Sequence, residues 1–283
     1  MSEAGDSGNY CYRHPNRQSF VLCQRCGRTI CGECQTPAAV GVVCPECMRA
    51  QRASMPRTRP RVLTRVSRLP GSGAPVVTYG IIALSAFVFI LQSIPGMGGS
   101  VTDALQYAGL YSYPQFFEPW RMLTSVFAHV SILHIALNMY TFWIFGQLLE
   151  PLLGRWRYAV LYLTCGLAGS VAVLLLADPR QPVIGASGAI FGMLGAFLVI
   201  QRRLGGNATQ LLILVGLNLV IGFIPGFHIA WQAHIGGLVV GALLGLIFVE
   251  TRPRSRHGLQ VGLLVAVAVV LIVIGCWPVI AAG

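Results

Sequence analysis

Long apolar segments fill most of the chain after residue 75, and they restrict the folds that this sequence can adopt. Of the 283 residues, 55% are hydrophobic and only 10% are charged, whereas an average soluble domain carries about 25% charged residues. A membrane-spanning helix needs about 20 apolar residues. We therefore predict an all-α polytopic membrane protein with seven spans, the fourth and fifth of them short, over residues 76–94, 122–149, 158–177, 187–200, 210–223, 231–249 and 259–280.

The arginines indicate how these spans are oriented. Cytoplasmic loops of membrane proteins collect positive charge, and all 20 cationic residues of this chain are arginines. Eleven precede the first span and seven follow the second, fourth and sixth spans, whereas only Arg121 and Arg180 fall on the other side. This distribution predicts a cytoplasmic N-terminus and a C-terminus outside. It explains the net charge of +11 as a topology signal, so we expect no nucleic-acid partner.

Seven of the nine cysteines lie in one short segment near the N-terminus. With one histidine they form four pairs, each with the two-residue spacing that presents two ligands to a tetrahedral zinc ion. A disulfide cluster is the alternative, but the first residues do not read as a signal peptide, which favours a reducing compartment where disulfides are rare. We therefore expect two structural zinc ions in a cytosolic domain over residues 1–48, held by Cys11 and His14, Cys23 and Cys26, Cys31 and Cys34, and Cys44 and Cys47.

The order of these pairs resembles a treble-clef or B-box-like cross-brace. This resemblance implies that the first and third pairs share one ion and the second and fourth the other, although spacing alone leaves the partition open. The segment 49–75 is rich in arginine and proline without apolar periodicity, and we expect it to be a linker. A cytosolic protein partner for the zinc domain is one hypothesis for its role.

Polar residues inside hydrocarbon are costly, so each one in a predicted span is a candidate functional residue. Ser187, His134 and His234 each lie fifteen or sixteen residues before the cytoplasmic end of their span. At about 1.5 Å per residue, all three reach a layer about 22 to 24 Å from the inner face of a core about 30 Å thick. A conduit would instead carry polar groups through the full thickness of the membrane.

Small residues indicate which spans touch. Two spans carry a small residue at every fourth position, namely Gly188, Gly192 and Ala196 in the fourth and Gly237, Gly241 and Gly245 in the sixth. Such stripes allow two helix backbones to approach closely. We therefore predict that the fourth and sixth spans pack together and bring Ser187 beside His234.

A serine beside a histidine can perform nucleophilic catalysis, in which the imidazole takes the hydroxyl proton and returns it to the leaving amine. The acidic residues lie at the ends of spans or in loops, so we expect a dyad. His134, Asn138 and the Ser187 amide are candidate donors to an oxyanion. The alternatives are structural: a packing serine, a satisfied histidine at His234, and a helix bridge at His134 and Asn138. We expect His129 to be structural or to hold water.

Four motifs lie in order within residues 76–249, namely PWR at 119–121, HVSILHIALN at 129–138, GASG at 185–188 and AHIGGLVVG at 233–241. In these motifs the chain resembles the rhomboid family of intramembrane serine proteases. The resemblance implies that Ser187 is the nucleophile and His234 the base. It also implies that His134, Asn138 and the Ser187 amide form the oxyanion hole.

The resemblance further implies a supporting shell. Phe191 would stack on His234, at a position where many family members carry tyrosine, and Gly185 belongs to the serine motif. Trp120 and Arg121 would make a structural contact in the aromatic outer loop, which we expect to lie in the headgroup layer. Glu150 would anchor the inner end of the second span.

The resemblance also implies the substrates, which are single-span membrane proteins cut in or near their spans, where the helix must unwind. We expect a six-helix protease core over residues 76–250, an additional loop and seventh span over 251–283, and a bacterial plasma membrane as location. No cofactor is expected for catalysis. A catalytically dead relative, a channel or transporter, and a membrane-tethered zinc regulatory module are the competing hypotheses, although a dead relative would normally lack Ser187 or His234.

Overall fold

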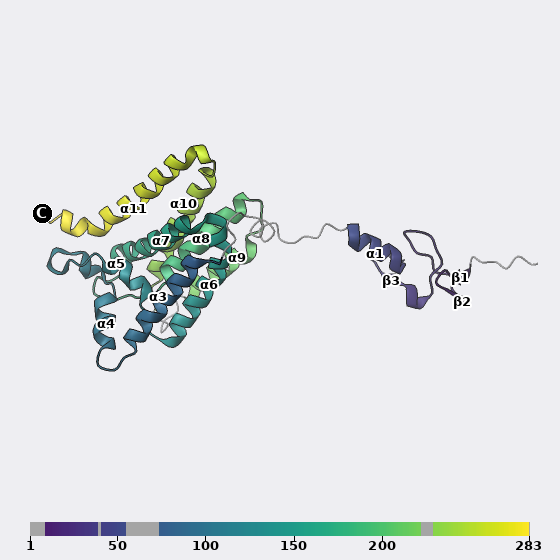
Figure 1. The fold of residues 1–283 in the computed structure, drawn as a ribbon, viewed down its shortest axis with the longest axis horizontal. Coiled ribbons are helices and arrows are strands. Elements are labelled where there is room, and N and C mark those ends of the chain that lie inside the picture. Colours follow the sequence, from purple (N-terminus) through teal and green to yellow (C-terminus); the bar gives the residue numbers. More distant parts are fainter. Residues whose placement is uncertain (1–8, 39–40, 55–73, 222–228, 283) are drawn as a thin grey trace, which may run out of the picture. The chain divides into compact units, whose positions relative to one another are not determined.

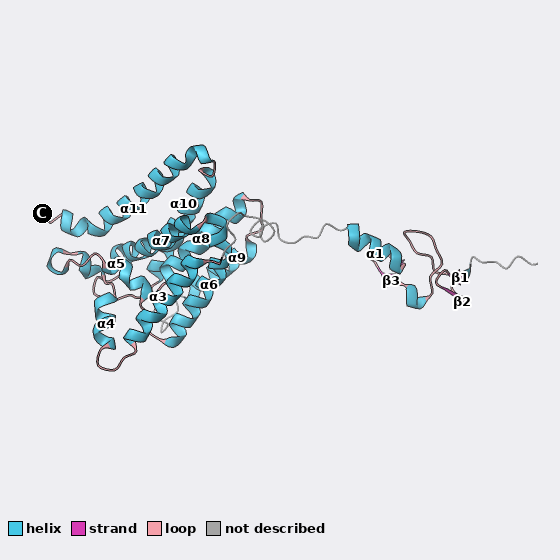
Figure 2. Cartoon of the chain, in the orientation of Figure 1, coloured by secondary structure: helices cyan, strands magenta, loops and turns pink. Residues whose placement is uncertain are grey.

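The computed structural model describes residues 9–38, 41–54, 74–221 and 229–282, and Figures 1 and 2 trace them. The chain divides into two compact units, Met1–Arg59 and Pro60–Gly283. Most of the expected linker, as well as residues 222–223 of the predicted fifth span, lies outside the described residues.

The first unit is small and is built around its cysteines. Its elements are the hairpin of β1 (Tyr10–Cys11) and β2 (His14–Gln18), the 3₁₀ helix η2 (Gly32–Cys34), the hairpin of β3 (Thr36–Pro37) and β4 (Val42–Val43), and α1 (Pro45–Ser54). Among the described residues, its apolar core consists of five cysteines together with Ile30 and Val43. So small a core rarely stabilises a fold without disulfides or metals. Helix α1 continues to Ser54, past the expected domain boundary at residue 48.

The second unit is helical, and it confirms the predicted all-α membrane fold. A helix occupies each of the seven predicted spans. Among the described residues, four helices are long and apolar enough to cross a bilayer, and Val76–Gln92 and Thr209–Val220 are shorter apolar helices. The helices are α3 (Val76–Gln92), α4 (Gly98–Leu105), α5 (Arg121–Thr124), α6 (Ile132–Leu153), α7 (Arg155–Leu176), α8 (Ser187–Arg203), α9 (Thr209–Ile221), α10 (Trp231–Glu250) and α11 (His257–Ile280), with the short 3₁₀ helices η3 (Gly109–Ser112), η4 (Pro114–Phe116), η5 (Ser125–Phe127) and η6 (Arg254–Arg256).

The second predicted span differs from the structure at its start. We expected one segment from residue 122, but α5 and η5 end before an extended turn, and α6 begins only at Ile132. The cause is Ser131, whose extended backbone leaves the helix and whose side chain accepts a hydrogen bond from the His134 N–H. This is an N-cap. It places His134 in the first turn of α6.

The predicted contact between the fourth and sixth spans is confirmed. A Cβ atom added to Gly237 or Gly241 of α10 would collide with the carbonyl oxygen of Gly188 or Gly192 in α8. Gly245 meets the backbone of Ala196 in the same way. The three glycines of α10 therefore face the three small residues of α8, in register.

Glu150 of α6 holds the start of α3. Its carboxylate is buried and accepts hydrogen bonds from the backbone N–H groups of Val77 and Thr78, at 2.9 and 2.8 Å, and from the Thr78 hydroxyl at 2.8 Å. These donors belong to the first turn of α3, where N–H groups lack helical partners and the helix dipole favours an anion. The negative charge inside the bundle is thereby compensated.

Polar contacts near the arginine-rich helix ends bring these ends together. The Arg203 guanidinium at the end of α8 lies 3.2 Å from the Glu250 carboxylate at the end of α10. Gln260 of α11 accepts a hydrogen bond from Arg157 of α7 at 2.6 Å and donates one to Thr251 at 2.7 Å. The C-terminal helix, seen at the edge of the bundle in Figure 1, is thus fixed to α7 and to the end of α10 at the arginine-rich side.

Substituting Gly241 with leucine tests the close approach of α8 and α10. We expect Gly241→Leu to destabilise the detergent-solubilised protein by about 1–3 kcal/mol or more, because the new side chain must displace the backbone of Gly192. The matched control is Gly262→Leu in α11, where an added Cβ meets no atom within 4 Å. Thermal unfolding followed by circular dichroism measures both. Equal unfolding temperatures for the two variants would contradict the packing argument.

Candidate active site

Ser187 and His234 are in direct contact. The Ser187 Oγ and the His234 Nε2 lie 2.9 Å apart, although 47 residues separate them in the sequence. Ser187 is the first residue of α8, and His234 lies in the first turn of α10. The hydrogen bond therefore follows from the glycine-mediated pairing of these helices.

The imidazole of His234 is buried and held by an aromatic ring. Phe191, one turn after Ser187 on α8, stacks on it with centroids 4.1 Å apart and planes 11° from parallel. The other ring nitrogen, Nδ1, has no hydrogen-bond partner among the residues that the structure describes. Ring stacking on Phe191 thus fixes the plane of this imidazole, a role that a carboxylate plays for the histidine of a serine–histidine–aspartate triad.

The segment before Ser187 is fixed by its backbone. Gly185 has φ 129°, a conformation that side-chain-bearing residues rarely adopt, and its N–H donates to the Ser125 carbonyl at 3.0 Å. Two residues earlier, Val183 and Tyr107 exchange both backbone hydrogen bonds. These backbone hydrogen bonds fix the turn that precedes α8. Ser187 is half-buried, and its amide lies in the first turn of this helix.

His134 lies against this turn. A Cβ atom at Gly185 would come within 2.8 Å of the His134 Nε2, so only glycine leaves room for the ring. The Val130 N–H donates to the His134 Nδ1 at 3.5 Å. A neutral imidazole that accepts at one nitrogen carries its proton on the other. His134 therefore presents an Nε2–H donor to the chain just before Ser187.

Asn138 is buried one turn further along α6. Its amide nitrogen donates to the His134 carbonyl at 2.9 Å, and an amide nitrogen carries a second hydrogen.

His129 is also buried, with its ring centroid 5.1 Å from that of His134. Neither ring nitrogen of His129 has a partner among the described residues, and a buried polar group of this kind usually binds water.

Gln92 is a residue near the site that is not among the predicted ones. Its side-chain oxygen accepts the backbone N–H of His129 at 3.0 Å, and its amide donates to Thr102 at 2.9 Å. It links α3, α4 and the turn before α6. A polar residue near the end of an apolar span is the signal that identifies it.

Trp120 and Arg121 differ from the expected contact. The Arg121 guanidinium is buried over the ring of Tyr111, 4.1 Å from its centroid, and it donates to Glu118 and to the backbone carbonyls of Asp103 and Gln106. The side chain of Trp120 is 57% exposed. The Arg121 side chain points inward because these acceptors satisfy its N–H donors. Its guanidinium makes a cation–π contact with the ring of Tyr111.

The four ligand pairs of the first unit form two groups that could each hold a metal ion. In each group the four ligand atoms lie within 4.8 Å of one another, as a single tetrahedral ion requires. The groups match the cross-brace arrangement. One contains Cys11, His14, Cys31 and Cys34, and the other contains Cys23, Cys26, Cys44 and Cys47.

Hydrogen bonds to three cysteines of the second group, Cys23, Cys26 and Cys44, favour their thiolate forms. The Cys44 N–H donates to the Cys23 sulfur at 3.1 Å, and the Cys47 N–H donates to the Cys44 sulfur at 3.3 Å. The backbone and side chain of Arg28 lower the pKa of Cys26 below that of a free thiol. Since the thiolate is the form that binds metals, these donors fit a metal centre.

Part of the chain is similar to known proteins. A protein-family model, the Rhomboid domain, matches residues 117–251. The chain is 34% identical to Rhomboid protease GluP of Bacillus subtilis over 70% of this chain and 40% of that protein. It is 33% identical to RHOMBOID-like protein 6, mitochondrial, of Arabidopsis thaliana over half of each chain. It is 30% identical to the rhomboid-family protein YdcA of Bacillus subtilis over 64% of this chain and 92% of that protein.

The extent of these matches differs between the relatives. The chain spans about half the length of the first curated relatives, 40% of GluP and 50% of RHOMBOID-like protein 6, but nearly the whole of YdcA. The family model therefore covers the part of the helical unit that carries Ser187 and His234.

Proposed function

This chain belongs to the rhomboid family, and we propose that it is an intramembrane serine endopeptidase that uses a Ser187–His234 dyad. The observation that carries this proposal is the 2.9 Å hydrogen bond between the Ser187 Oγ and the His234 Nε2 inside an apolar helix bundle. A hydroxyl and an imidazole in this geometry can transfer a proton directly.

In the proposed reaction, the Ser187 Oγ attacks the scissile carbonyl while the His234 Nε2 takes its proton. The tetrahedral intermediate expels the amine, which receives that proton from His234, and Ser187 remains acylated. Water then attacks the ester, gives one proton to His234, and the acid product leaves as Ser187 regains the proton. Phe191 supports these steps by keeping the imidazole plane fixed through stacking.

The oxyanion of the intermediate needs donors that are already in place. We assign the Ser187 amide, the Nε2–H of His134 and the second amide hydrogen of Asn138 to this role. The His134 tautomer supports the assignment, since Val130 occupies Nδ1. Gly185 supports it by leaving space for the His134 ring. We assign His129 to holding water near the site.

The proposed substrates are single-span membrane proteins in the bilayer. Ser187 is half-buried at the end of the bundle remote from the ion pair of Arg203 and Glu250. A peptide bond reaches it only after its own helix unwinds, because helical backbone groups in lipid stay paired. Cleavage is therefore expected near one membrane surface.

We propose that this surface is the outer face of a bacterial plasma membrane. The helix ends that carry most arginines are joined by Arg203–Glu250 and Arg157–Gln260 contacts, and positive charge marks the cytoplasmic side. The N-terminus is then cytoplasmic and the C-terminus lies outside, beyond α11. The proteins with which the chain is compared include two from Bacillus subtilis.

Zinc is the ion that we propose for the two groups of the first unit. Three cysteines with one histidine, and four cysteines, are both common structural zinc sets, and closed tetrahedral sites of this kind stabilise small folds. The residues of these sites would keep the two hairpins and α1 together. Catalysis at Ser187 would need neither ion.

We propose that the zinc domain recruits a cytosolic protein or a substrate tail. The observation that favours this role is an apolar loop on its surface, in which Phe20 is 73% exposed and Val21 and Leu22 are 40% and 54% exposed. Exposed apolar residues grouped in this way mark interaction surfaces.

Removing either member of the dyad should abolish cleavage. We expect Ser187→Ala and His234→Ala to lower kcat on the order of 10⁴-fold or more, as for other serine proteases. Ser93→Ala is the control, since this serine is exposed and its hydroxyl donates to the carbonyl of Phe89 in α3. A fluorescently labelled single-span substrate in proteoliposomes gives the rates. Cleavage by Ser187→Ala at the native rate would disprove the proposal.

Metal analysis tests the zinc sites. Protein purified without chelators should contain two zinc ions per chain, one for each group. Cys26→Ser should lower the zinc content toward one ion, whereas Cys276→Ser, which alters a cysteine outside the groups, should keep both. Inductively coupled plasma mass spectrometry measures the content. Zinc-free native protein, or equal zinc in the two variants, contradicts the assignment.

Shortening the chain tests recruitment. Deletion of residues 1–48 and the pair Phe20→Ser with Leu22→Ser should both reduce cleavage of some substrates in cells, while the purified variants keep their rate on the labelled substrate. Comparative proteomics of shed membrane proteins gives the readout, with Ser187→Ala as the fully inactive reference. If neither change affects cleavage of any substrate in cells, recruitment is disproved.

A further inference from the structure

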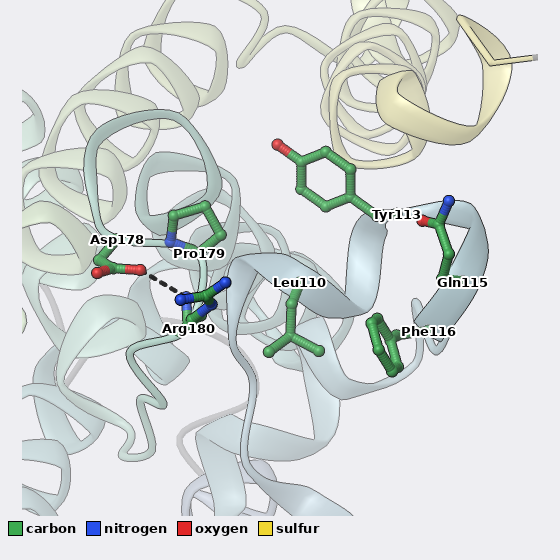
Figure 3. Close-up of a pocket in the computed structure, with 7 residues that line it drawn as sticks. All are labelled: Leu110, Tyr113, Gln115, Phe116, Asp178, Pro179 and Arg180. Atoms are coloured by element: carbon green, nitrogen blue, oxygen red, sulfur yellow. Dashed lines mark hydrogen bonds between the residues drawn. The ribbon is translucent and has the colours of Figure 1, made fainter.

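Two adjacent hollows lie beside the outer loop, and Tyr113 lines both. The first, of about 380 Å³, lies between η3–η4 and the turn after α7. The second, of about 240 Å³, lies between the end of α7 and the last turns of α11. Figure 3 shows the Tyr113 side chain among the residues that line the first hollow, and the same residue also lines the second. We call the two hollows together the Tyr113 groove.

The two ends of the Tyr113 groove differ in polarity. The first hollow contains Asp178, Arg180 and the amide of Gln115. The second is lined by apolar side chains of α7 and α11, among them Leu175 and Trp277. A charged end beside an apolar end matches an amphiphile, because ionic groups stay in the headgroup layer and alkyl chains in hydrocarbon.

The apolar end lies where lipid chains lie. Leu175 belongs to the predicted third span and Trp277 to the seventh, and their side chains are 63% and 60% exposed at the bundle surface. Tryptophan is enriched where hydrocarbon meets headgroups. Asp178 and Arg180 follow the end of α7 directly, so they are placed at headgroup level.

The charged end offers one group of each sign. Asp178 accepts the backbone N–H of Arg180 at 2.8 Å, the contact drawn in Figure 3. Neither the Asp178 carboxylate nor the Arg180 guanidinium takes part in an ion pair within the part of the chain that the structure describes. A guanidinium binds a phosphodiester well, and a carboxylate binds an ammonium group. Together they complement a zwitterionic headgroup.

We propose that the Tyr113 groove binds one molecule of phosphatidylethanolamine. Its phosphate contacts Arg180, its ammonium group contacts Asp178, and an acyl chain lies between α7 and α11 against Trp277. Near the groove, α11 also contacts α5, because Gly275 of α11 packs against Met122 of α5. The lipid extends this contact and joins the outer loop, α7 and the C-terminal helix.

Native mass spectrometry of the full chain, titrated with phosphatidylethanolamine in detergent, tests this site. We expect one lipid to bind more tightly than any later one. Arg180→Gln should weaken this first binding about fivefold, the effect of one arginine at a membrane surface, and Trp277→Ala should also weaken it. Arg252→Gln is the control, since Arg252 is an exposed arginine beyond the end of α10.

Two further probes separate headgroup from chain. Glycerophosphoethanolamine, which has no acyl chains, and diacylglycerol, which has no phosphate, should each bind at least fivefold more weakly than the intact lipid. The proposal is overturned if Arg180→Gln and Arg252→Gln bind phosphatidylethanolamine equally. It is overturned as well if either partial molecule binds as tightly as the lipid. Circular dichroism of each variant shows whether it is folded.

Discussion

The close approach of α8 and α10 is the contact on which the rest of the site depends. Gly237 and Gly241 leave no space between their backbone and that of α8, so the two helices are fixed in depth as well as in distance. Ser187 and His234 lie at the same end of this contact, and their hydrogen bond needs no flexible loop to form. A rigid pair of helices is a better support for reacting groups than a loop, because small displacements cost rate.

The second constraint is that polar groups inside the bundle must be satisfied. Glu150 has three donors, Arg121 has a carboxylate, two carbonyls and an aromatic ring, and Gln260 connects two helices. Within the described part of the bundle, buried polar atoms of Ser85, His129, Tyr162 and His234 have no protein partner. The two histidines among them lie at the candidate site. Unsatisfied buried groups are expected at functional sites, where they meet water or substrate.

Much of this could be predicted from the sequence because its strongest signals are physical and local. The length of the apolar segments predicted the spans, and a helix occupies each of them. The glycines at every fourth position identified α8 and α10 as packed neighbours. The spacing of the cysteines defined the ligand pairs. The start of α6 was missed because the residues after 121 are nearly as apolar as the helix, and only the capping hydrogen bond of Ser131 separates them. The contact between Arg121 and Tyr111 was not predicted either, because it depends on how the outer loop folds back.

The alternation of the two ligand groups along the chain affects how the first unit assembles. Cys23 and Cys26 lie inside the loop that Cys11 and Cys34 close, and Cys31 and Cys34 lie inside the loop that Cys23 and Cys47 close. If one group binds an ion first, the chain between the ligands of the other group is already shortened. The entropic cost of closing the second loop is then smaller. The two sites therefore gain affinity from each other without sharing an atom. A chain that holds one ion would therefore bind a second ion more tightly than an empty chain binds its first.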